Sequence, residues 1–70
     1  MYLTFTNASP AHKGNKVAIH KDLILTVHES VVTRDDETLE TVTFIFGPPH
    51  GTWEVSESLE EVVAILNDLA

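Results

Sequence analysis

The sequence predicts an α+β domain in which a short-stranded, strongly bent antiparallel β-sheet is followed by one C-terminal amphipathic helix. Several short runs alternate apolar and polar residues, which is the period of a half-buried strand. Glycine, proline and small polar residues separate these runs. Near the end of the chain, apolar residues recur at helical spacing. No linker, low-complexity tract or internal repeat interrupts the 70 residues, so we expect a single domain over residues 1–70.

Five runs have the composition of strands. We expect them at residues 2–7, 16–20, 23–32, 39–46 and 52–55. The run 23–32 is long and rich in β-branched residues, and such a strand usually bends in a small barrel-like sheet. The polar segment 33–38 lies between two of the runs and therefore predicts a hairpin connection.

The fourth run contains the most aggregation-prone segment of the chain. Val42, Phe44 and Phe46 alternate with Thr43 and Ile45, so neither face of this strand suits water. A β-prone, uncharged segment without proline promotes aggregation when it forms an exposed edge. We therefore expect another surface to cover it.

A helix is predicted over residues 59–69. Ser58 and Glu61 have the spacing of a capping box, in which each side chain bonds the other residue's backbone N–H. The apolar stripe consists of Leu59, Val62, Val63, Leu66 and Leu69, with Ile65 at its margin. This stripe is expected to cover one face or end of the sheet.

Chain length and cysteine content together favour oligomerisation. A chain of 70 residues buries a small fraction of its unfolded surface, and this one has no cysteine for a disulfide or a thiolate metal site. Association of copies is the remaining source of stability. We expect a cytoplasmic protein without a signal peptide, since no apolar run approaches the roughly 20 residues that span a bilayer.

Charge is distributed unevenly along the chain. Residues 1–21 contain three lysines and no acid, a charge of +3, whereas Arg34 stands against eleven acids from residue 22 onward, a charge of −10. Two interpretations remain open. The asymmetry is either solvated surface that helps the basic segment of one copy meet the acidic segment of another, or a basic patch of Lys13, Lys16 and Lys21 that contacts phosphates.

The sequence contains no catalytic motif at a diagnostic spacing, so we expect no enzymatic activity and no cofactor. Four histidines have neither helical nor hairpin ligand spacing, so we expect no metal site. The segment 47–51 with nearby Trp53 is the most distinctive feature. Trp53 is either a core residue of a short strand or a stacking surface for a base.

The segments Tyr2-Leu3-Thr4-Phe5-Thr6-Asn7 and 44–55, which begins Phe-Ile-Phe-Gly-Pro-Pro-His-Gly, resemble a group of small proteins of marine metagenome and putative cyanophage origin. Their fold is similar to that of Sm and Sm-like proteins. The resemblance implies a five-stranded SH3-like (Sm-like) barrel that closes into a homo-oligomeric ring through edge strands, with a role in binding RNA or DNA. The segments 22–24 and 55–62 also resemble the small FlbD-like flagellar proteins, which implies the same sheet-then-helix layout.

We accordingly expect a phage-type Sm-like homo-oligomer, a ring of five to seven copies. The subunit interface is expected at Val42, Phe44, Ile45, Phe46 and Trp53, where it would satisfy exposed backbone groups of strands four and five. Phosphate contacts are expected from Lys13, Lys16 and Lys21, with His50 nearby. If phage-encoded, the protein would act in the host cytoplasm, away from membranes. The alternative is a structural or protein-interaction accessory module that works through its acidic hairpin and helix.

Overall fold

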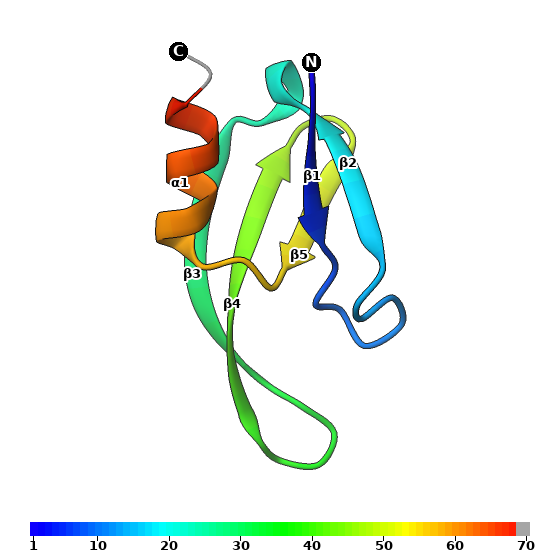
Figure 1. Ribbon diagram of the computed structural model, residues 1–70. Coiled ribbons are helices and arrows are strands. Elements are labelled where there is room, and N and C mark those ends of the chain that lie inside the picture. Colours follow the sequence, from blue (N-terminus) through cyan, green and yellow to red (C-terminus); the bar gives the residue numbers. More distant parts are fainter. Residues whose placement is uncertain (69–70) are drawn as a thin grey trace.

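The computed structural model describes residues 1–68 of the chain. It contains β1 (Tyr2–Thr6), β2 (Lys16–His20), the 3-10 helix η1 (Lys21–Leu23), β3 (Thr26–Thr33), β4 (Leu39–Gly47), β5 (Gly51–Val55) and α1 (Leu59–Asn67). Five antiparallel strands followed by one C-terminal helix confirm the predicted α+β layout (Figure 1).

The strands form two sheets within the described residues. One pairs β1 with β2, and the other has the order β3-β4-β5. The sheets meet where β1 ends, because Asn7 bridges Val55 and the Ala8 N–H donates to the Glu54 carbonyl. The expected single barrel is therefore observed only as two joined sheets, and no closed barrel is present in residues 1–68.

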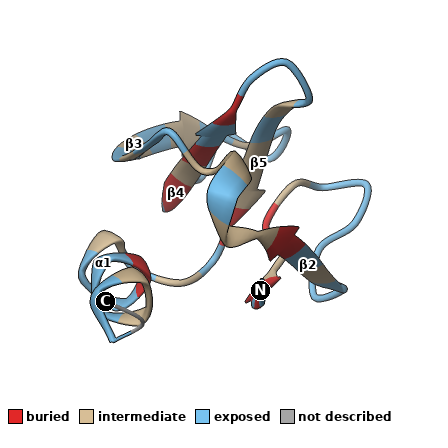
Figure 2. Cartoon of the chain, turned by 90° about the horizontal axis from the view of Figure 1, so that it is seen from above, coloured by how far each residue is buried: buried red, intermediate tan, exposed pale blue. Residues whose placement is uncertain are grey.

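The hydrophobic core lies between the three-stranded sheet and two elements on one side of it. In Figure 2 the β1–β2 hairpin and α1 lie side by side below that sheet. The buried cluster takes residues from all three parts: Leu3, Phe5, Ile19, Ile45, Val55 and Val62.

The segment predicted as one long strand over 23–32 begins differently. Residues 21–23 form η1, and β3 starts only at Thr26. The His20 imidazole accepts a hydrogen bond from the Asp22 N–H at 3.1 Å, and the Ile24 N–H donates to the Lys21 carbonyl. Local side-chain and turn bonds of this kind compete with strand pairing, so the prediction is wrong for this first turn.

The helix begins as predicted. Ser58 and Glu61 form the reciprocal capping box, and Val62 is fully buried against the sheet. Val63, expected in the same stripe, is instead 39% exposed at its margin. The described helix ends at Asn67, and the predicted contribution of Leu69 lies outside the described residues.

Gly47 at the end of β4 is required by close packing. A Cβ at this position would lie 2.6 Å from the Leu23 carbonyl oxygen and 2.8 Å from the Trp53 ring. Gly47→Ala is therefore expected to lower the free energy of unfolding by about 1–3 kcal/mol in urea denaturation, the usual cost of overpacking. Thr52→Ala, at an exposed position of the adjoining strand, is the control. Equal stability of both variants and the wild type would contradict the close approach.

Candidate functional site

The three lysines predicted to contact phosphate do not form one patch. Lys13 lies in the loop between β1 and β2, with its ammonium 3.9 Å from the Glu40 carboxylate. Lys16 begins β2 and donates to the Thr6 hydroxyl at 2.8 Å. Lys21 follows the other end of β2, in η1. A strand of five residues therefore separates Lys16 from Lys21, and Lys13 faces the acidic hairpin.

Lys21 and His50 do lie at the same end of the molecule. The close approach of Gly47 to Leu23 places the β4–β5 turn against η1, and His50 occupies that turn. Tyr2 pairs with His20 at this end and is 69% exposed. The Tyr2 ring contacts the His20 imidazole edge to face, with ring centroids 5.1 Å apart. We call Tyr2, His20, Lys21 and His50 the turn end. The sequence reasoning missed Tyr2 and His20, which only the β1–β2 register brings beside Lys21.

The predicted interface through backbone groups is wrong for strand four, whereas β5 is an outer strand of its sheet. β4 lies between β3 and β5 and is paired on both sides by its own chain. Val42 and Ile45 are 2% and 0% exposed within a single copy. Side chains already enclosed by their own chain have no surface left to offer a partner.

The remaining predicted interface residues divide between the two faces of the sheet. Phe44 is half-buried, and its ring stacks on His28 with centroids 5.4 Å apart. Phe46 is 38% exposed on the same outward row of β4. Trp53 instead packs, half-buried, against the hydrophobic core, as the core interpretation of this residue predicts. Phe44 and Phe46 are thus the predicted interface residues that lie at the surface.

Within residues 1–68 each sheet has two outer strands, β1 and β2 in one and β3 and β5 in the other. The outer edges of β1 and β5 meet at the Asn7–Val55 bridge, whereas those of β2 and β3 pair with no other strand. β3 is eight residues long and contains neither lysine nor proline, the residues that most often keep an edge from pairing with another chain. The edges of β2 and β3, rather than the central strand β4, are therefore places where another strand can be added.

Arg34 joins the distal hairpin to the rest of the fold. Its guanidinium donates to Glu40 at 2.7 Å, to Glu54 at 2.9 Å and to the Ala8 carbonyl at 2.9 Å. The hydrogen bonds to Glu40 and then Glu54 raise the pKa of Arg34. The Arg34 bond in turn is the main cause that lowers the pKa of Glu40. We call Arg34, Glu40 and Glu54 the clamp.

The ion pair of Arg34 with Glu40 predicts how the stability of the fold changes at acid pH. Because the folded pKa of Glu40 is lowered, its stabilising contribution is complete above the ordinary pKa of 4.5 and is lost as pH falls through the folded value. We expect the melting temperature of the wild type to fall with acidification below that pH, and to fall less steeply in Glu40→Gln. Parallel curves from thermal melts of the two proteins would contradict this role of Glu40.

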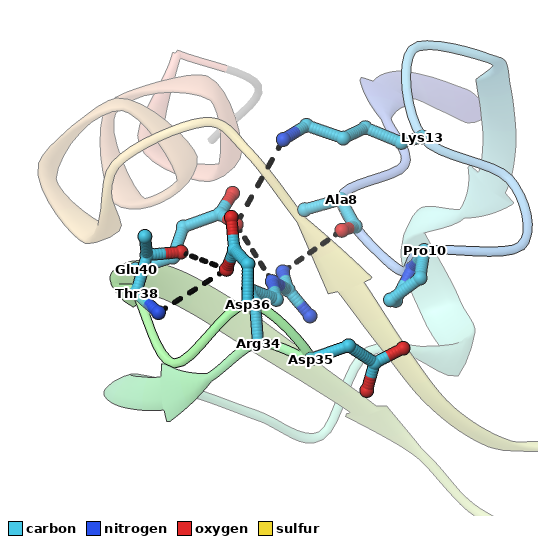
Figure 3. Close-up of a pocket in the computed structure, with 8 residues that line it drawn as sticks. All are labelled: Ala8, Pro10, Lys13, Arg34, Asp35, Asp36, Thr38 and Glu40. Atoms are coloured by element: carbon cyan, nitrogen blue, oxygen red, sulfur yellow. Dashed lines mark hydrogen bonds and ion pairs between the residues drawn. The ribbon is translucent and has the colours of Figure 1, made fainter.

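A pocket of about 380 Å³ adjoins the clamp. It lies between the loop after β1 and the β3–β4 turn (Figure 3). Its lining consists of Ala8, Pro10, Lys13, Arg34, Asp35, Asp36, Thr38 and Glu40. Three of these side chains are carboxylates and two are basic. The Asp36 carboxylate accepts bonds from the backbone N–H and the hydroxyl of Thr38.

The chain was compared with protein-family models, curated proteins and solved structures, and it matches none of them. Within residues 1–68, histidines and acids form no group with the geometry of a metal site. No helix in that part of the chain is long and apolar enough to cross a membrane. The features of the described chain that bear on function are the open strand edges, the turn end and the clamp pocket.

Proposed function

We propose that this protein is a non-enzymatic, Sm-like homo-oligomeric module whose copies join by pairing β2 of one copy with β3 of the next. The observation that carries the proposal is that the outer edges of β2 and β3, one from each sheet, pair with no other strand in residues 1–68. Exposed backbone donors and acceptors of this kind bind readily to another strand.

The hydrogen bonds at the strand ends indicate which backbone groups are free. Bonded pairs alternate along an antiparallel ladder. The Lys21 N–H donates to Met1, so Val17 and Ile19 bond β1 and Ala18 directs its backbone groups outward. The Arg34 N–H donates to Thr38, so the even-numbered residues of β3 bond β4. Glu29 and Val31 therefore present their N–H and C=O groups at the open edge.

Joining two different edges gives a head-to-tail assembly, which closes into a ring when the rotation between copies allows it. Charge favours the same arrangement. The β2 edge lies in the segment of charge +3, and the β3 edge carries Glu29 and leads into the acidic turn Asp35–Glu37. A second copy thus offers each edge a partner of opposite charge.

This electrostatic contribution predicts a salt effect on assembly. Raising ionic strength from ~0.05 to ~0.5 M shortens the screening length several-fold. We expect the assembly to dissociate at several-fold higher protein concentration in the high-salt buffer, as measured by sedimentation velocity. Sodium chloride that leaves the dissociation concentration unchanged would remove the role of charge, and a monomer in both buffers would remove the assembly itself.

The turn end favours a second function, the binding of single-stranded RNA or DNA. Lys21 and His50 lie at one end with the exposed ring of Tyr2, a combination of cation and aromatic surface that suits a phosphate and a stacked base. An assembly would repeat this end in every copy. A ring would therefore present several copies of this local surface, against a net charge of −7 per copy that repels polyanions.

A fluorescence titration with a labelled single-stranded oligonucleotide at low salt tests this second function. We expect Tyr2→Ala with Lys21→Ala to weaken binding at least about tenfold, since stacking contributes ~1–3 kcal/mol per base. Lys13→Ala, which removes a lysine held beside Glu40, is the matched control and is expected to bind like the wild type. An assembled wild type that binds neither RNA nor DNA would instead indicate the structural or protein-interaction module.

A further inference from the structure

The clamp pocket is separate from both the strand edges and the turn end. It lies at the distal hairpin, between that hairpin and the loop after β1 (Figure 3). Its volume of about 380 Å³ is at the lower end of the range typical of ligand pockets. A site of this size accommodates one side chain or a small molecule.

The charges around the pocket favour a cation. Asp35, Asp36 and Glu40 line it together with Lys13 and Arg34, which leaves a net charge of −1 among the lining side chains. The guanidinium of Arg34 pairs with Glu40 and also with Glu54, which is outside the pocket lining. The field within the pocket is therefore negative, although it contains two basic residues.

One ammonium group, that of Lys13, already lies near a carboxylate of the pocket. The Lys13 side chain is 67% exposed, and its ammonium stands 3.9 Å from the Glu40 carboxylate, longer than a hydrogen bond. Such an exposed pair contributes little stability and is readily exchanged. Asp35, in the β3–β4 turn, also lines the pocket, and its side chain makes no hydrogen bond or ion pair with the described residues. A second cation would thus find the Asp35 carboxylate unoccupied, beside a Glu40 carboxylate that Arg34 binds at 2.7 Å and Lys13 contacts only loosely.

The remaining wall suits an alkyl stem. Pro10 contributes exposed apolar surface beside the carboxylates, whereas Ala8 is buried. A lysine or arginine side chain places its methylene groups on such surface while its charged head reaches the acids. We propose that the clamp pocket receives the lysine or arginine side chain of a basic partner protein, which displaces the ammonium of Lys13 from Glu40.

The probes are short blocked tripeptides, Ac-Gly-Lys-Gly-amide and Ac-Gly-Arg-Gly-amide, titrated into the full chain at low salt. Ac-Gly-Nle-Gly-amide keeps the alkyl stem of lysine without its charge, and Ac-Gly-Glu-Gly-amide reverses the charge. We expect saturable shifts of backbone amide resonances in residues 8–13 and 34–40 with the cationic peptides alone. Equal shifts with norleucine, preferential binding of the glutamate peptide, or no shifts with any peptide would overturn the proposal.

Three variants test which side chains of the pocket bind the peptide. Asp35→Asn removes an unpaired carboxylate of the pocket and is expected to weaken binding at least about threefold. Glu37→Gln makes the same change of charge in the same turn outside the pocket lining and is the matched control, expected to bind like the wild type. Lys13→Gln removes the internal competitor and is expected to tighten binding. Equal weakening by the two acidic variants, or weaker binding by Lys13→Gln, would contradict the site.

The edge variant Val31→Pro, which is designed to be monomeric, tests whether the pocket binds a cation without a second copy of the chain. The proposal predicts that this monomer binds the lysine peptide with unchanged affinity, because residue 31 is outside the lining. Spermidine that competes better than the peptide would overturn the assignment to a protein side chain. Loss of peptide binding in the monomer would likewise overturn it, in favour of a pocket completed by a second copy.

Discussion

Phe5→Ala is expected to lower the free energy of unfolding by about 3–5 kcal/mol, the cost of deleting a buried aromatic side chain. Phe5 is 0% exposed and belongs to the cluster that joins the β1–β2 hairpin to Ile45 of the sheet and Val62 of the helix. A small domain has only about 5–15 kcal/mol of total stability. Urea denaturation followed by circular dichroism measures the loss.

Tyr2→Ala is the matched control for this experiment. Tyr2 lies in the same strand, is 69% exposed and is also aromatic. We expect its substitution to change stability by less than about 1 kcal/mol, because surface substitutions usually have small effects. If the two variants lose equal stability, the alternation of buried and exposed residues in β1 does not describe the folded chain.

Val31→Pro is expected to abolish assembly while the single copy stays folded. The N–H of Val31 faces the open edge of β3, so proline at this position removes a donor offered to the next copy but no bond to β4. Val32→Pro, one residue along, would remove the donor paired with Glu40 and is expected to destabilise the sheet itself. Light scattering reports mass, and circular dichroism reports the fold of each variant.

Val31→Thr provides the control for Val31→Pro. Threonine keeps the backbone N–H and the β-branched shape of valine. Val31 is 58% exposed, so the added hydroxyl can reach water. We expect this variant to assemble like the wild type. Assembly of the proline variant at wild-type concentrations would place the joint elsewhere, and the outward row with Phe44 and Phe46 would then be the next surface to test.

The parts of the fold that depend on local pattern could be predicted from the sequence. The Ser58–Glu61 capping box marks the start of α1, and alternation locates β1 and β2 to within a residue. The η1 turn was missed because its bonds involve His20 and Asp22, just before a run whose β-branched composition favours a strand. Local hydrogen bonds of a few polar atoms outweighed strand propensity there.

The candidate site was less predictable because it depends on contacts between distant segments. Composition singled out residues 42–46 as adhesive, but only the pairing with both β3 and β5 reveals that β4 is a central strand. The clamp joins Ala8, Arg34 and Glu54, and no spacing in the sequence relates these residues. The single arginine in a strongly acidic region was the one available signal.

The mass of the unmodified protein in solution, measured by light scattering at tens of micromolar, tests the proposed assembly most directly. The account predicts one species at an integral multiple of the 7.7 kDa chain, with the ring expected at five to seven copies. A single monodisperse species of 7.7 kDa at low salt would contradict it.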